Sequence, residues 1–123
     1  MNNAFNDYKN QAQMKILMAK KEELPLFLYD GAIKFCNIAI VGIEKKDFEK
    51  AHINIVKVEN IIEYLRVTLD ETKEVSKDFI NIYNYIDYHL VQANVKKDVE
   101  ELNLVLKELR DLKELWQKIL NNN

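Results

Sequence analysis

The sequence is poor in the residues that build turns and cross-links, because its 123 residues include only two glycines, one proline and one cysteine. So few glycines and prolines leave little material for tight turns, bulges or phosphate-binding loops, which makes an all-β fold, a Rossmann unit or a P-loop enzyme improbable. A single cysteine excludes a disulfide framework and a thiolate metal cluster, and it indicates a reducing compartment. The first residues contain no basic region followed by an apolar run, so we expect no signal peptide and a cytoplasmic location.

Apolar and charged residues are both plentiful, at 48% and 31%, and 18 Lys and Arg nearly balance 20 Asp and Glu. A chain of this length and apolar content can bury one core, and its net charge of −2 argues against a nucleic-acid partner. The most apolar segment, residues 24–43, contains Asp30 and Lys34. Each charge near a bilayer centre costs roughly 2.5–3.5 kcal/mol, which cancels the gain from the apolar side chains around it. We therefore expect no membrane insertion, and we expect this segment to be the most buried helix.

Apolar residues recur three and four positions apart along most of the chain, a spacing typical of helices that bury one face. The two clearest series are Phe48, Ala51, Ile55, Val58, Ile62, Leu65 and Leu69, and then Leu102, Val105, Leu109, Leu112, Trp116 and Ile119. The pattern predicts helices over about 21–43, 47–69, 74–94 and 98–121, with residues 1–20 outside them as a flexible segment or lid. The predicted fold is therefore all-α, an antiparallel up-and-down four-helix bundle with a short N-terminal extension.

Local signals mark several helix ends. We expect Gly42 and the charged residues after it to end the first helix, and Asp47 to cap the second. Asn94 can adopt the left-handed conformation that closes a helix, so we expect the third helix to end there. Asp98 and Glu101 have the spacing of a capping box at the start of the fourth helix.

Three residues could carry chemistry, but each favours a structural interpretation. Glu49 and His52 form a Glu-x-x-His motif, which di-iron carboxylate bundles use because both side chains lie on one helix face. Such a site needs a second motif, and the other histidine, His89, has Ile86 three residues before it. We therefore expect His52 to be a partly exposed side chain near a helix start, with no metal and no cofactor. Cys36 lies in the most apolar helix without a charged activator adjacent in sequence, which favours a buried, inert thiol and no enzymatic site.

The second predicted helix carries an additional apolar face, which we call the outer stripe: Ile53, Val56, Tyr64 and Val67. At 100° per residue these side chains lie within about 80° of one another, nearly opposite the core series. A helix normally buries one face, so a second apolar face needs a cover unless its residues are ordinary scattered surface residues. The functional interpretation is a groove that binds an amphipathic segment of a partner, with Tyr8 and Leu17 as lid or contact residues. Further apolar residues lie off the core lines of the next two helices, namely Ile80, Tyr88, Val91, Leu104 and Leu115.

Several runs of sequence resemble the FliS family of flagellar export chaperones. They are Asn3–Lys9, Leu28–Phe35 with its Leu-Tyr-Asp-Gly-Ala motif, Tyr85–Asn94, and Leu109–Trp116. The chain departs from the family at Lys20 and Lys21, where Ser-Pro is usual, and near His89, where a pair of arginines is missing.

The resemblance implies a non-enzymatic helical bundle in the cytoplasm. Such a bundle binds the disordered C-terminal segment of new flagellin, prevents premature polymerisation, and presents flagellin to the flagellar export gate. The residues themselves leave two alternatives open: a metal- or cofactor-binding helical bundle with redox activity, and a coiled-coil adaptor that dimerises through the outer stripe.

Overall fold

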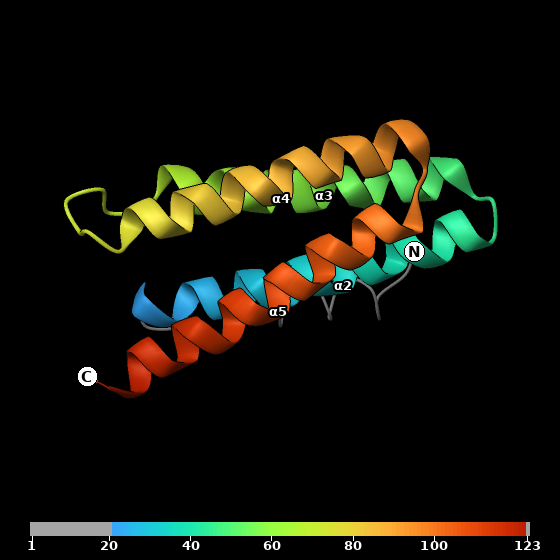
Figure 1. Cartoon of the computed structure of the whole chain (residues 1–123). Coiled ribbons are helices and arrows are strands. Elements are labelled where there is room, and N and C mark those ends of the chain that lie inside the picture. The colour runs from blue at the N-terminus through green and yellow to red at the C-terminus, as the bar shows by residue number, and fades with distance from the viewer. Residues whose placement is uncertain (1–20, 123) are drawn as a thin grey trace, which may run out of the picture.

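The computed structural model describes residues 21–122, and within these residues it contains helices and no strand (Figure 1). The elements are a 3-10 turn η1 (Lys21–Glu23) and the helices α2 (Leu24–Glu44), α3 (Phe48–Val67), α4 (Ser76–Lys96) and α5 (Val99–Asn121). The predicted all-α four-helix bundle is confirmed, and the helix ends differ from the predicted ones by at most three residues. The largest difference is at the start of α2, where residues 21–23 form the 3-10 turn.

The helices form two layers, with α3 and α4 in one and α2 and α5 in the other (Figure 1). Each helix packs against two neighbours, in the ring order α2, α3, α4, α5. The α2–α3 and α4–α5 connections lie at one end of the bundle and the α3–α4 connection at the other, so consecutive helices run antiparallel (Figure 1). The short connections make this up-and-down arrangement the natural one.

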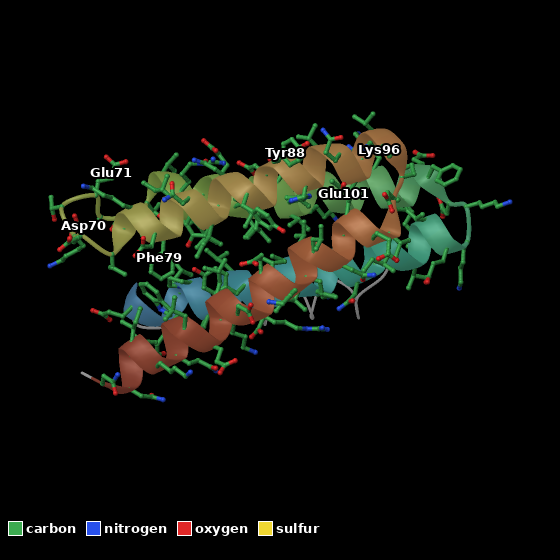
Figure 2. The ribbon with its side chains drawn as sticks, in the orientation of Figure 1. Asp70, Glu71, Phe79, Tyr88, Lys96 and Glu101 are labelled. Atoms are coloured by element: carbon green, nitrogen blue, oxygen red, sulfur yellow. The ribbon has the colours of Figure 1, made fainter. Side chains whose placement is uncertain are left out.

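The core lies between the layers and takes one or two side chains from each helical turn. Across it, the Tyr29 hydroxyl of α2 and the Tyr83 hydroxyl of α4 form a buried hydrogen bond of 2.7 Å. Phe79 lies on the inner side of α4 (Figure 2) and packs edge-on against Trp116 of α5, with ring centroids 5.7 Å apart. The Trp116 indole also donates a hydrogen bond of 2.6 Å to the carbonyl of Glu22, which fixes the start of α2 against the end of α5.

The N-terminal caps are only partly as predicted. Asp47 caps α3, accepting a hydrogen bond of 3.1 Å from the backbone N–H of Lys50. Asp98 caps α5 through the backbone N–H of Glu100. The expected capping box is wrong, because the Glu101 carboxylate is hydrogen-bonded to the His89 imidazole of α4 instead of returning to the cap.

The predicted end of the third helix at Asn94 is wrong. Helix α4 continues through Asn94 to Lys96, and Lys97 takes the left-handed conformation with φ of 50°. Helix α2 ends at Glu44, among the charged residues that follow Gly42 and within one residue of the predicted end. Gly42 also serves packing, because a Cβ there would lie 3.1 Å from the backbone nitrogen of Ala51, which is a tight contact where α2 and α3 meet.

The expectation that residues 24–43 form the most buried helix is confirmed by exposure, because only four of these residues are exposed, a smaller share than in any other helix. Five residues of α2 are buried, no more than in the other helices, and many of its apolar side chains, such as Leu28 and Phe35, are partly buried. By length and composition alone, α2 is also the one described helix that could cross a membrane. Its Asp30 forms an ion pair of 2.6 Å with Lys113 of α5, which ties it into the bundle.

Candidate functional site

The outer stripe lies on the side of α3 that points away from the rest of the bundle. Ile53 and Tyr64 are each 46% exposed and Val67 is 66% exposed, whereas Ile55 on the opposite side of the helix is fully buried. Val56 is partly buried. Three of the four stripe residues therefore present apolar surface that nothing in residues 21–122 covers. Tyr8 and Leu17, the other two residues expected to take part in binding, lie outside the described residues.

One residue of the expected core series of α3 is exposed instead of buried. Phe48 is 47% exposed, although its spacing places it in line with Ala51 and Ile55. Phe48 is the first residue of α3, at the end of the bundle, where the facing helices no longer cover it. Its aromatic ring therefore adds to the apolar surface of α3. Next to it, a shallow hollow of about 300 Å³ is lined by Asp47, Glu49, Lys50, Ile53 and Asn54.

Apolar surface continues onto α4. Tyr88, which Figure 2 marks on α4, is 60% exposed, and Val91 and Val95 are 47% and 78% exposed. Val91 lies two turns after Asn84, whose side chain bonds to Arg66 of α3, so Val91 lies on the side of α4 that borders α3. The outer faces of α3 and α4 therefore form one apolar surface interrupted by a polar seam.

Arg66 holds that seam together. Its guanidinium donates a hydrogen bond of 2.7 Å to the Asn84 side chain and forms an ion pair with Asp87, both on α4. The same guanidinium lies 3.0 Å from the Glu63 carboxylate, one turn earlier on α3. The hydrogen bond to Asp87 is the main reason why the pKa of Arg66 is raised. At one point along the bundle, this single side chain thus fixes the distance between α3 and α4.

Glu59 lies in the same seam, one turn before Glu63. Burial and, after it, repulsion by Asp87 raise the pKa of the Glu59 carboxyl, while His52 partly offsets this. His52 itself is exposed, as predicted, and its Nδ1 lies 2.9 Å from the Asn94 amide nitrogen of α4. No ion pair or hydrogen bond from residues 21–122 reaches the Glu59 carboxylate. The seam therefore carries three carboxylates, of Glu59, Glu63 and Asp87, against the one guanidinium.

Sequence reasoning missed this group of charges. The spacing of Glu59, Glu63 and Arg66 places them on one side of α3, which the sequence does show. Asp87 follows Arg66 by 21 residues and belongs to another helix, so its part in the group depends on how α3 and α4 pack.

A second polar contact links α4 to α5. The His89 imidazole is hydrogen-bonded to the Glu101 carboxylate, and Tyr85 and Tyr88 pack edge-on against the imidazole with ring centroids 4.3 and 5.1 Å away. Figure 2 marks Tyr88 and Glu101 on these two helices. Because the pair is largely enclosed by the two tyrosine rings and the helices, it fastens α4 to α5 and leaves no open group for catalysis.

The single cysteine is buried, as predicted. Cys36 is fully buried, and its thiol lies 3.5 Å from the Leu102 carbonyl oxygen of α5, to which it donates. Burial raises the pKa of the thiol to about 12, which keeps it protonated and unreactive at neutral pH. Within residues 21–122, no three His, Cys, Asp or Glu side chains gather in a way that could hold a metal ion.

Comparison with known proteins points to one family. The family model described as "Flagellar protein FliS" matches residues 1–123. A protein of Bacillus subtilis (strain 168) named "Flagellar secretion chaperone FliS" is 34% identical over 117 residues, covering 95% of this chain and 88% of the relative. Relatives of the same name from Campylobacter jejuni and Escherichia coli (strain K12) are 30% and 29% identical, covering 98% and 85% of this chain and 94% and 79% of their own lengths.

Proposed function

This chain belongs to the FliS family of flagellar secretion chaperones, and we propose that it binds the C-terminal segment of flagellin through its outer stripe. The family is one of chaperones, not of enzymes. In this proposal the chain works in the cytoplasm, keeps newly made flagellin from polymerising too early, and delivers it to the flagellar export gate. It needs no nucleic acid and no membrane insertion for this role.

The observation that carries the proposal is the exposed apolar surface of α3 and α4. A flagellin segment that becomes helical in the filament has an apolar face, and that face self-associates if it is left free. An amphipathic helix that lays this face along the outer stripe buries both apolar surfaces at once. Removal of apolar surface from water is worth roughly 25 cal/mol per Å², which provides the driving force.

The same physics explains why the client can be released. A segment that is disordered before binding loses conformational entropy when it folds on the chaperone, and this loss offsets part of the gain from apolar burial. The complex is therefore weaker than its contact area alone suggests. Moderate affinity suits a protein that must hand over its client at the export gate.

The test introduces charge into the middle of the stripe. We expect the double variant Val56→Asp and Tyr64→Asp to keep the circular dichroism spectrum of the parent and to lose binding of a C-terminal flagellin peptide in calorimetry. An unpaired carboxylate in a desolvated apolar contact costs several kcal/mol, enough to remove binding altogether. Unaltered affinity of this variant refutes the assignment of the site to the outer stripe.

A matched control changes apolar residues of similar exposure on another helix. Leu104 and Leu115 of α5 are 42% and 40% exposed, and we expect Leu104→Asp with Leu115→Asp to bind the peptide like the parent. Sedimentation with and without flagellin then separates the proposal from a dimeric adaptor. A one-to-one complex with flagellin supports the chaperone, whereas a stable homodimer that the stripe variant breaks supports the adaptor.

A further inference from the structure

The charges beside the outer stripe restrict what kind of helix fits there. Glu59 follows Val56 by three residues and Glu63 precedes Val67 by four, so both carboxylates border the stripe on α3. Asp87 approaches the same place from α4. The polar seam between the two apolar faces is therefore negative.

Glu59 is the carboxylate in this seam whose charge is not balanced. Arg66 already binds Glu63 and Asp87, and in the described part of the chain it forms no ion pair or hydrogen bond with Glu59. Partial burial and the nearby Asp87 make the anionic form of Glu59 unfavourable, as its raised pKa shows, and the exposed His52 compensates only in part. A lysine or arginine of a bound helix could therefore form an ion pair with the partly desolvated Glu59 carboxylate.

We infer that the guest helix carries a lysine or arginine at the border of its apolar face, and that this cation pairs with Glu59 when the apolar face covers the outer stripe. This inference rests on the proposed function and adds a rule for the client sequence to it. Apolar contact along the stripe gives affinity, while the pair fixes the position of the guest along α3, because a shifted helix would bury Glu59 without a partner.

The inference predicts opposite effects of one substitution on stability and on binding. Folding raises the pKa of the Glu59 carboxyl, so its ionised form is less favourable in the folded protein than in the unfolded chain. Stability therefore falls as pH rises through the folded pKa, and at neutral pH the charge of Glu59 destabilises the empty protein. We expect Glu59→Gln to leave the urea midpoint of the empty protein unchanged or raise it. The same variant should bind a C-terminal flagellin peptide about two- to fivefold more weakly at low salt, the range of partly exposed ion pairs. A merely structural role for Glu59 would lower stability and binding together.

A charge exchange identifies the partner of Glu59 on the guest. Glu59→Lys should weaken binding of the parent peptide further, and a peptide in which one lysine or arginine is replaced by glutamate should restore binding to this variant alone. Glu71→Gln in the exposed α3–α4 connection removes the same charge away from the stripe and serves as the control, with binding like the parent.

The outcomes separate this inference from the proposed function. If Glu59→Gln binds like the parent, or no less tightly than Glu71→Gln, the cation rule is wrong, while loss of binding in the Val56→Asp and Tyr64→Asp variant still supports the stripe. If no lysine or arginine exchange in the peptide restores binding to Glu59→Lys, the cation rule is equally overturned. If the stripe variant binds normally, the proposed function fails first.

Discussion

The hydrogen bond between Tyr29 and Tyr83 allows a quantitative test of the core. Tyr29 is fully buried and Tyr83 is 2% exposed, so neither hydroxyl can turn to water if the other is removed. In Tyr29→Phe the Tyr83 hydroxyl keeps its burial and loses its 2.7 Å partner, and Tyr83→Phe has the converse effect. An unsatisfied buried hydroxyl costs roughly 1–3 kcal/mol, so we expect each single variant to lose about 2 kcal/mol of unfolding free energy.

The double variant should lose less unfolding free energy than the sum of the losses in the two single variants. When both hydroxyls are replaced, two rings of nearly the same shape face each other and no polar group is left unpaired. We therefore expect Tyr29→Phe with Tyr83→Phe to cost about 1 kcal/mol or less, against a sum of about 4 kcal/mol for the singles.

Urea unfolding followed by far-ultraviolet circular dichroism measures all four proteins. Equal dependence of the free energy on urea across the set shows that the compactness of the unfolded state has not changed. If the two single losses simply add up in the double variant, the hydroxyls do not depend on each other, and the reasoning from the buried hydrogen bond is refuted.

The two glycines and the cysteine give further predictions. Gly42→Ala should destabilise the protein by about 1–3 kcal/mol in thermal unfolding, because its Cβ meets the Ala51 backbone at 3.1 Å, whereas Gly31→Ala meets only Ile61 at 3.6 Å and should gain up to about 1 kcal/mol of helix propensity. Equal melting temperatures for these two variants would contradict the close approach of α2 and α3. Burial holds the pKa of Cys36 at about 12 against 9.0 unfolded, so stability should fall as pH rises above 9, and Cys36→Ala should make that fall shallower by about 1.4 kcal/mol per pH unit. Parallel curves of stability against pH for the two proteins would show that the thiol is not protected.

The sequence predicted the helices well because their burial follows a simple period. Ala51, Ile55 and Val58 recur at the spacing of a helix face, and the structure buries all three. Phe48 fits the same period and is exposed nonetheless, because a period describes one helix and not where its neighbours end. Apolar content correctly predicted that α2 is the least exposed helix, but not that side chains such as Phe35 are only partly buried, since that depends on the two helices beside it.

The candidate site could be predicted only where it depends on one helix. The exposure of Ile53, Tyr64 and Val67 follows from the fact that they lie opposite the core series of α3. The charge group is different, since Arg66 meets Asp87 only after α3 and α4 pack side by side. No spacing within one segment encodes the distance between two helices, so the unbalanced charge of Glu59 could not be foreseen.

The hydrogen bond between Trp116 and the Glu22 carbonyl places the only tryptophan of the chain at the point where residue 22 enters the bundle. Indole emission depends on the polarity and hydrogen bonding around the ring, so the tryptophan emission of this protein, excited separately from that of its tyrosines, reports on one junction. Separation of the start of α2 from the end of α5 would shift the emission without any attached dye. The molecule thus contains its own optical probe, near the end of α5.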